Sequence, residues 1–237
     1  MTLPEVKGFI DLSLVDWDDK VSAVLFLPRC NFRCPFCYNR QLVLEPEKQP
    51  SIPFEEIKQY LVRNRSWLDG VVITGGEPTI HSGLPGLCRE MRELGFQVKL
   101  DTNGTNPEMI REMMIQGLVT FFAVDVKAPL TEENYSMATG VQMGDLLVEV
   151  GETIEILLQG SVDYEFRTTL VPSLHSKQAV EQICRRIRGC RKFVLQNFKG
   201  DVEPIDVRLK GLDAFSDEQM NEFLNLAKKI VPNSFLR

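Results

Sequence analysis

Three cysteines lie close together near the start of the chain, in the segment RCNFRCPFCYN from Arg29 to Asn39. Cys30, Cys34 and Cys37 follow the pattern C-x3-C-x2-C. Clustered thiolates bind zinc or iron, and both a structural zinc ion and a closed [4Fe–4S] cluster normally take four protein ligands. With three thiolates, one iron of a [4Fe–4S] cluster keeps an open position at which a small molecule can bind. The segment therefore predicts a cluster that takes part in chemistry, with structural zinc as the alternative.

The other three cysteines do not form a second set of this kind. Cys88 falls in a predicted helix, and Cys184 and Cys190 lie on or beyond the end of another, without a further pair. Free cysteine is among the most buried residue types. We therefore interpret these three as buried or incidental thiols.

Polar residues interrupt apolar sequence at two further places. GGEPT, from Gly75 to Thr79, has two glycines that permit close backbone approach to a ligand, and its Glu77 can accept hydrogen bonds from an ammonium group. DTNGT, from Asp101 to Thr105, contains turn formers, so by itself an ordinary turn is its simpler interpretation.

A third polar segment, VDVKAP from Val124 to Pro129, carries Asp125 and Lys127 at the end of an apolar run. Two interpretations stay open for this pair. It is either a buried ion pair or a site at which the lysine binds a carboxylate.

The scaffold that must position these residues alternates between strands and helices. Strands are predicted at residues 21–27, 70–74, 96–102, 119–127, 163–171 and 192–198, where Val, Leu, Phe and Thr are concentrated. Helices are predicted at residues 54–64, 84–94, 107–117, 144–160, 176–189 and 216–229. Each polar motif directly follows or ends one of the strands.

Such alternation indicates parallel strands with right-handed crossovers. Six strands are fewer than the eight of a closed barrel, so we predict an α/β fold with a partial, open (β/α)6 TIM-like barrel; a flat doubly wound sheet is the alternative. We predict a single domain over residues 1–237, with its core at about 15–200 and a C-terminal helix at about 216–230. In either architecture ligands bind at the carboxyl ends of the strands, where the polar motifs lie.

Composition narrows the function further. The chain has 237 residues, a net charge of −6 and a pI near 5.2, which argues against nucleic acid as the main partner. The sequence has neither an apolar run of the roughly 20 residues that a membrane span requires nor a signal peptide at its start. We therefore expect a cytoplasmic protein with reduced thiols. The only histidines, His81 and His175, nearly exclude multi-histidine metal sites, and we expect both on the surface.

The cysteine segment, with the aromatic Phe36 just before Cys37, resembles the signature of the radical S-adenosylmethionine (SAM) superfamily. GGEPT resembles the superfamily's segment that holds the SAM amino group. The resemblance implies that the open iron chelates the amino and carboxylate groups of SAM. An electron from the reduced cluster then cleaves SAM to methionine and a 5'-deoxyadenosyl radical, which abstracts a hydrogen atom. Because the cofactor carries this chemistry, no side chain is expected to act as a catalytic acid or base.

DTNGT, VDVKAP and YEFRTTLVP extend the resemblance to one branch, the glycyl-radical-enzyme activases. The match implies that Asp101 and Lys127 sit at the methionyl end of SAM and that Arg167 reaches the SAM or peptide region. It also implies a monovalent cation bound by Asp101, Thr102 and Asp125. The residues that the resemblance assigns to cofactor binding are Phe36, Gly75, Gly76, Glu77, Pro78, Asp101, Asn103, Lys127 and Arg167.

Within that branch, the segment from Ser13 to Cys30 resembles the lead-in of the activases of anaerobic ribonucleoside-triphosphate reductase. The resemblance implies an enzyme that abstracts hydrogen from a backbone glycine of a glycyl radical enzyme. It also implies a low-potential electron donor such as flavodoxin or ferredoxin.

Four residues, at three places in the chain, depart from the activase pattern. Asp18-Asp19 stands where Pro-Gly is usual, Tyr38 stands where histidine is frequent, and Lys199 lies near the place of a SAM-contacting histidine. Two rival hypotheses stay open. One is a radical SAM enzyme acting on a small molecule or RNA; the other is a non-enzymatic iron–sulfur electron carrier or a zinc-binding adaptor. SAM cleavage on reduction separates the second rival from the rest.

Overall fold

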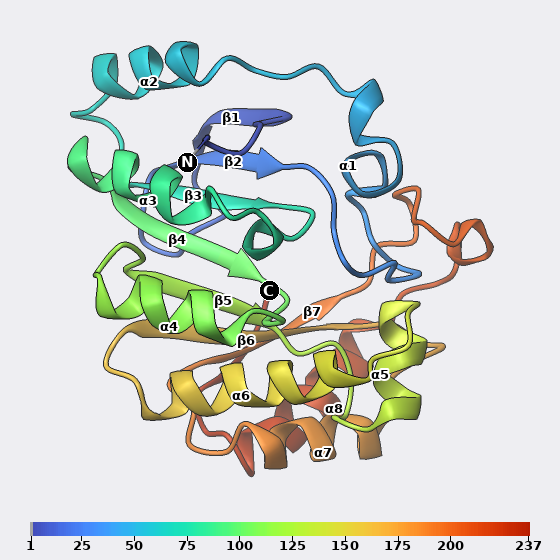
Figure 1. Cartoon of the computed structure of the whole chain (residues 1–237). Coiled ribbons are helices and arrows are strands. Elements are labelled where there is room, and N and C mark those ends of the chain that lie inside the picture. The colour runs from blue at the N-terminus through green and yellow to red at the C-terminus, as the bar shows by residue number, and fades with distance from the viewer. Residues whose placement is uncertain (1) are drawn as a thin grey trace. The chain divides into compact units, whose positions relative to one another are not determined.

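The computed structural model describes residues 2–237, and helices and strands alternate along the chain (Figure 1). Within these residues the strands are β1 Gly8–Ser13, β2 Ser22–Leu27, β3 Gly70–Gly75, β4 Gln97–Thr102, β5 Phe121–Asp125, β6 Asp163–Leu170, β7 Phe193–Asn197 and β8 Ser234–Leu236. The helices are α1 Arg40–Leu44, α2 Phe54–Arg63, α3 Leu84–Glu93, α4 Pro107–Ile115, α5 Glu132–Thr139, α6 Asp145–Gln159, α7 Lys177–Arg186 and α8 Asp217–Lys228. Short 3-10 helices lie at Pro46–Lys48, Pro78–Ile80 and Val207–Leu209.

The strands follow the order β1 to β8, in an α/β sheet that is mostly parallel. All six predicted strands are present as β2 to β7, and all six predicted helices are present as α2, α3, α4, α6, α7 and α8. The prediction missed β1, β8, α1 and α5. β1 pairs antiparallel with β2 and has a largely exposed, mixed sequence, so it lacks the apolar run that marked the other strands. The chain divides into two compact units, and a single domain stays a prediction.

The first unit comprises residues 2–31, Gln41–Thr102 and Glu108–Phe122. Its strands β2, β3 and β4 pair in parallel, and β2 and β3 are buried along nearly their whole length, as is typical of strands that are covered on both faces. Trp17 packs against the ring of Phe121 at a centroid distance of 5.8 Å. A Cβ atom at Gly70 would lie 2.7 Å from the Trp17 ring, so glycine at this position admits the indole.

The second unit comprises Phe32–Arg40, Asn103–Pro107 and Ala123–Arg237. Its strands β6, β7 and β8 pair in parallel, and the buried side chains of α6 and α7 are mainly aliphatic. Glu165, a buried residue of β6, lies 3.0 Å from the guanidinium of Arg237 and 3.0 Å from the ammonium of Lys192. These ion pairs compensate the burial of its charge.

Side-chain caps begin several helices of the second unit. The hydroxyl of Ser176 accepts a hydrogen bond at the start of α7, and Ser216 and Gln219 form a reciprocal capping box at the start of α8. Thr131 caps α5, and Gly140 ends it with φ 70°. The sequence of α5 is EENYSMAT, which buries only part of one face and so gave little apolar signal.

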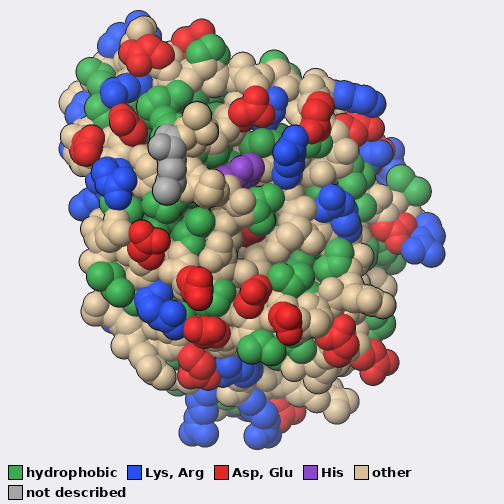
Figure 2. Space-filling view, viewed as in Figure 1, with side chains coloured by type: hydrophobic (Ala, Val, Ile, Leu, Met, Phe, Trp, Pro, Cys, Tyr) green, Lys and Arg blue, Asp and Glu red, His purple; other side chains and the backbone are tan. Residues whose placement is uncertain are grey.

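None of the helices within residues 2–237 is long and apolar enough to cross a membrane. On the face drawn in Figure 2, Lys and Arg side chains are interspersed with Asp and Glu side chains. Neither sign of charge dominates the part of the surface that this view presents.

Candidate active site

Backbone hydrogen bonds tie the entry of the cysteine segment to the turn after β3. β2 ends at Leu27, and Arg29 adopts a left-handed conformation with φ 65°. The Gly76 N–H donates to the Leu27 carbonyl at 2.9 Å, and the Glu77 N–H donates to the Arg29 carbonyl at 2.8 Å. The Arg29 N–H donates in turn to the carbonyl of Leu42 at 2.8 Å. The backbone of Arg29, the residue before Cys30, is therefore held by hydrogen bonds at both its N–H and its carbonyl group.

The two glycines of GGEPT allow this close approach. A Cβ atom at Gly76 would lie 1.7 Å from the Arg29 carbonyl oxygen, and one at Gly75, whose φ is +121°, would lie 2.3 Å from the Leu27 carbonyl oxygen. The sequence predicted that the glycines would bring the backbone close to a ligand. Within this unit they bring it close to the backbone that leads into the cysteine segment.

Glu77 is a buried carboxylate, only 1% exposed. Its Oε1 atom accepts hydrogen bonds from the Thr79 N–H at 3.0 Å, the Thr79 hydroxyl at 2.6 Å and the Thr102 hydroxyl at 2.6 Å. We call Glu77, Thr79 and Thr102 the Glu77 cluster. A buried carboxylate of this kind interacts favourably with a cationic group such as an ammonium.

Asp101 has a lysine partner that sequence analysis did not identify. Lys99 is 2% exposed, and its Nζ atom lies 3.3 Å from Asp101 Oδ1 and donates to the carbonyl oxygen of Asp16. The signal that could have revealed it is a charged residue at an inward position of the apolar strand β4. Lys99 thereby fixes Asp101 at the carboxyl end of β4.

Cys34 and Cys37 belong to the second unit and share one turn, in which the Cys37 N–H donates to the Cys34 carbonyl at 3.0 Å. Burial raises the pKa of Cys34 to about 12 and also raises that of Cys37, whereas the charge of Lys127 acts in the opposite direction on both thiols. Iron binding would displace these protons, because the thiolate is the ligand. Cys30 is half-buried and lies in the first unit.

The described residues 2–237 contain no group of three or more His, Cys, Asp or Glu side chains that is gathered as a metal site. The ligand set Cys30, Cys34 and Cys37 therefore stays a prediction. The other three cysteines, Cys88, Cys184 and Cys190, are free and buried, as their interpretation required.

Asp125, Lys127 and Arg167 form a connected group of charges, which we call the Lys127 cluster. Asp125 Oδ2 accepts from Lys127 Nζ at 2.8 Å, and its Oδ1 accepts from Arg167 Nε at 2.8 Å. Burial alone would raise the pKa of Asp125, but the charges of Arg167 and Lys127 outweigh it and lower this pKa to about 2. These three side chains carry two positive charges and one negative charge.

The ion pair that was one interpretation of Asp125 and Lys127 is thus present. It does not exclude the other interpretation, since an ammonium group has three donors and can bind a second carboxylate besides that of Asp125. Burial by itself would lower the pKa of Lys127, but the neighbouring Asp125 outweighs this and raises it, so the lysine stays charged.

The prediction that His175 lies on the surface was wrong, since the residue is 4% exposed. The reason is that both ring nitrogens find backbone partners, the Val171 N–H at 3.0 Å from Nδ1 and the Lys127 carbonyl oxygen at 2.9 Å from Nε2. Burial lowers the pKa of His175. His81 is half-buried, and its Nε2 lies 2.8 Å from the carbonyl oxygen of Pro28.

The simpler interpretation of DTNGT is supported, because Asn103 makes a local turn. Its Oδ1 atom accepts from the Thr105 N–H at 3.1 Å and from the Thr105 hydroxyl at 2.7 Å. Gly104 has φ +80°, and its carbonyl accepts from the Thr153 hydroxyl of α6 at 2.7 Å. Among the remaining predicted cofactor residues, Phe36 and Pro78 are buried.

Tyr38 and Lys199, two of the positions that depart from the activase pattern, contact each other. The Lys199 N–H donates to the Tyr38 hydroxyl, and the Tyr38 ring stacks on Phe198 with centroids 6.1 Å apart. Because Tyr38 directly follows Cys37, these contacts fasten the cysteine segment to the chain beyond β7. The sequence showed both departures but not that they form a pair.

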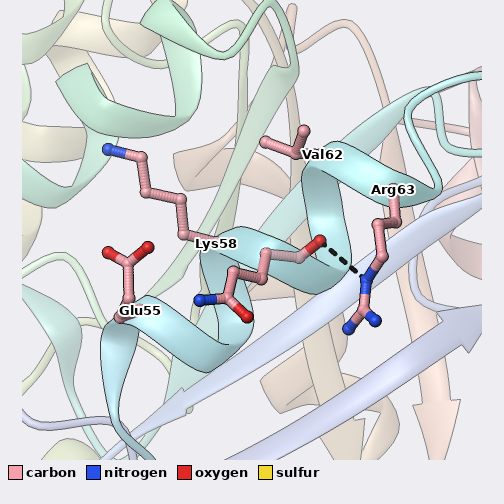
Figure 3. A pocket seen from close by; sticks show the side chains of 5 residues that line it. Glu55, Lys58, Val62 and Arg63 are labelled. Carbon is pink, nitrogen blue, oxygen red and sulfur yellow. Dashed lines mark hydrogen bonds between the residues drawn. The ribbon is translucent and has the colours of Figure 1, made fainter.

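A surface depression of about 320 Å³ lies on α2 and is lined by Glu55, Lys58, Gln59, Val62 and Arg63. Figure 3 draws the side chains that line it. One helix supplies all of these residues. None of them belongs to the predicted site. The predicted site residues follow the strands, whereas α2 lies before β3 in the chain, so the depression is not the candidate site.

Residues 24–172 match the family model of the radical SAM superfamily. The chain belongs to this superfamily. A protein of Methanocaldococcus jannaschii with the provisional name glycyl-radical enzyme activating enzyme MJ1227 is 31% identical to this radical SAM protein, over 98% of this chain and 95% of the relative. A 7-carboxy-7-deazaguanine synthase from Thermococcus kodakarensis is 26% identical, over 85% of this chain and 79% of the relative.

The radical SAM fold is also evident in solved structures. SuiB of Streptococcus suis, bound to S-adenosylmethionine, superimposes with a TM-score of 0.65 at 15% identity, covering 90% of this chain and 51% of SuiB. The present chain thus spans about half the length of SuiB. At this identity the likeness shows the fold alone, and it confirms the predicted fold class, the open (β/α)6 TIM-like barrel of the superfamily.

Membership of the superfamily implies a [4Fe–4S] cluster and SAM. The residues present fit these groups by their chemistry. Cys34 and Cys37 offer two thiols beside a positive charge, Glu77 offers a buried carboxylate suited to the ammonium group of SAM, and Lys127 offers an ammonium group suited to its carboxylate.

Proposed function

We propose that this radical SAM protein is an activating enzyme that abstracts a hydrogen atom from a backbone glycine of a glycyl radical enzyme. The observation that carries the proposal is the relative with this provisional name, whose 31% identity extends over 98% of the chain. The lead-in from Ser13 to Cys30 adds support for anaerobic ribonucleoside-triphosphate reductase as the partner.

In this proposal Cys30, Cys34 and Cys37 hold the [4Fe–4S] cluster, and the chain's other residues bind and orient SAM. Glu77 accepts hydrogen bonds from the SAM ammonium group, and Lys127 donates to the SAM carboxylate. The remaining contacts come from Phe36, Gly75, Gly76, Pro78, Asp101, Asn103 and Arg167. When bound, the cluster and SAM supply reductive cleavage of SAM and removal of a hydrogen atom.

Acid–base catalysis by a side chain is not part of this mechanism. The Glu77 cluster and the Lys127 cluster hold fixed charges that match the two charged groups of the methionyl end of SAM. In this proposal two residues bind the two oppositely charged groups of the amino-acid part of SAM, which orients the molecule before any bond is broken.

A monovalent cation at Asp101, Thr102 and Asp125 completes the proposed site. These oxygens take part in protein hydrogen bonds or ion pairs, and carboxylate and hydroxyl oxygens have more than one lone pair each. We further propose that the enzyme works in the cytoplasm, because clustered thiols of this kind need a reducing compartment. Its electron comes from a low-potential donor such as flavodoxin or ferredoxin, as the resemblance to the activases implies.

The test is anaerobic incubation of the reconstituted protein with SAM, a strong reductant and an anaerobic ribonucleotide reductase. We expect an electron paramagnetic resonance doublet, because a glycyl radical couples to its one remaining α-hydrogen. With deuterium at the target glycine, the label should appear in 5'-deoxyadenosine, which receives the abstracted atom.

The controls separate the rivals. The Cys34→Ala variant should give neither doublet nor 5'-deoxyadenosine. If the wild-type protein cleaves SAM and no glycyl radical enzyme acquires a radical or transfers its label, the proposal is overturned in favour of a small-molecule substrate. If SAM is not cleaved at all on reduction, an electron carrier replaces both enzymatic hypotheses.

A further inference from the structure

The backbone of Lys127 lies outside the strand ladder. β5 ends at Asp125, so the sheet does not hold the peptide groups of Lys127 in the regular way. One residue earlier, the Val126 N–H still donates to the Arg167 carbonyl at 2.8 Å, and the Val126 carbonyl accepts from the Thr168 hydroxyl at 2.8 Å. Side chains supply the fixing of the Lys127 peptide groups themselves.

Two buried side chains provide it. The Lys127 N–H donates to the hydroxyl of Tyr135, which is 0% exposed on α5, at 3.2 Å. The Lys127 carbonyl oxygen lies 2.9 Å from Nε2 of His175, which is 4% exposed. Neither residue was assigned to the site by sequence analysis, and they come from different segments of the second unit.

The hydrogen bonds of His175 determine its tautomer. The Val171 N–H can only donate, and it donates to Nδ1 at 3.0 Å, so Nδ1 carries no proton. The Lys127 carbonyl oxygen can only accept, so Nε2 must carry the proton. His175 is therefore the neutral Nε2–H form and works as a donor to Lys127, fastened at its other nitrogen to the end of β6.

We propose that His175 is a positioning residue of the SAM site, which holds the carbonyl group of Lys127 and thereby sets where the Lys127 ammonium lies. This inference rests on the proposed role of Lys127 in binding the SAM carboxylate. Fixing the backbone of Lys127 removes backbone freedom that would otherwise be lost when its ammonium meets a ligand, and it sets the point from which the side chain extends. The ion pair with Asp125 at 2.8 Å fixes the other end.

The alternative is that His175 only stabilises the fold. Two substitutions separate these roles, because each keeps one of the two hydrogen bonds. His175→Asn has an amide oxygen near the position of Nδ1 and can still accept from Val171, but it loses the donor to Lys127. His175→Gln has an amide nitrogen near the position of Nε2 and can still donate to Lys127, but it loses the acceptor for Val171.

The experiment measures the SAM dissociation constant, the iron content and the unfolding temperature of each reconstituted variant. We expect His175→Asn to bind SAM about three- to tenfold more weakly, the effect of one lost hydrogen bond, and His175→Gln to bind within about twofold of the wild type. Both variants should unfold at lower temperature and retain their iron. Wild-type affinity in His175→Asn, or equal weakening in both variants, overturns the inference.

Two further variants separate a failure of the inference from a failure of the proposed role of Lys127. If Lys127→Ala binds SAM as tightly as the wild type, the proposed role of Lys127 has failed and the inference falls with it; if Lys127→Ala is weak and His175→Asn is normal, only the inference has failed. Should His175→Asn not fold, His175→Met replaces it, since methionine has no donor for the Lys127 carbonyl. Wild-type affinity in His175→Met then overturns the inference.

Discussion

At the scale of single residues, the Lys127 cluster gives one carboxylate two cationic partners. Asp125 stays ionised over the whole working range of pH, because Arg167 and Lys127 lower its pKa to about 2 against the effect of burial. Lys127 then has two roles that differ in consequence. It stabilises Asp125 in the fold, and in the proposed enzyme it also meets the carboxylate of SAM.

Replacing Lys127 with alanine tests the second role. We expect Lys127→Ala to weaken SAM binding by about tenfold to a hundredfold, since a charge-assisted hydrogen bond contributes about 1.5–3 kcal/mol. Equilibrium titration of the reconstituted protein measures this, and the iron content should not change. Lys177→Ala is the matched control, because Lys177 forms an exposed pair with Glu222. Equal affinity in both variants would reduce Lys127 to a structural ion-pair partner.

At the scale of elements, the turn after β3 and the start of the cysteine segment are joined by backbone hydrogen bonds. Gly76 lets the turn approach Arg29 so closely that their backbones hydrogen-bond through Glu77. Arg29 takes up a left-handed conformation there, with φ 65°, which non-glycine residues rarely adopt. The position of Cys30 thus depends on a glycine far along the chain.

A methyl group at Gly76 should disturb this contact between the turn and the backbone of Arg29. We expect Gly76→Ala to lower the free energy of unfolding by about 1–3 kcal/mol and to reduce the iron retained after reconstitution, because the new Cβ would lie 1.7 Å from the Arg29 carbonyl oxygen. Urea denaturation and iron analysis measure the two effects. Gly86→Ala is the control, since its Cβ would meet only Leu3 at 3.4 Å and alanine favours the helix α3. Normal iron retention in Gly76→Ala would show that the turn does not position the cysteine segment.

The cysteine segment itself makes a prediction about ligands. Alanine at Cys30, Cys34 or Cys37 should give a folded protein that holds no [4Fe–4S] cluster, since two thiolates leave two irons without protein ligands. Alanine at buried Cys88, Cys184 or Cys190 should leave the cluster in place. Visible absorption and iron content after anaerobic reconstitution decide between the two sets. Loss of the cluster in Cys88→Ala with retention in Cys30→Ala would reverse the assignment.

At the scale of the whole molecule, stability depends on pH through buried groups that must stay neutral. His175 is the clearest case, because both of its ring hydrogen bonds go to backbone groups and burial lowers its pKa below the ordinary value of 6.5. Its neutral form is required in the folded protein, whereas the unfolded chain can take up the proton. The contribution of His175 is therefore fully present above pH 6.5 and is lost as the pH falls below this value.

Urea unfolding between pH 7.5 and about 5 tests the direction of this pH dependence. The free energy of unfolding should fall as the pH drops, with a contribution from His175 of at most about 1.4 kcal/mol per pH unit. His175→Gln lacks the titrating ring, so subtracting its curve from that of the wild type isolates the contribution. Parallel curves for the two proteins would contradict a neutral, buried His175.

Local sequence patterns predicted most of the helices and strands. Six strands and six helices were predicted from apolar runs and end signals, and the polar motifs were correctly assigned to strand ends. The missed elements, β1, β8, α1 and α5, are short or only partly buried, so they carry little of the apolar signal on which the prediction depended. The cysteine spacing indicated the family, which the family match to residues 24–172 confirms.

The sequence by itself determined which residues could carry the chemistry, since residue type and spacing decide what can bind iron or a charged ligand. Only the tertiary structure decided which partners hold them. His175 meets Lys127 across 48 residues, Arg167 meets Asp125 across 42, and Lys99 meets the backbone of Asp16 across 83. Periodicity tells which face of a strand a residue lies on. It does not tell which distant side chain is brought within hydrogen-bonding distance, because that depends on strand register and on the paths of the intervening loops.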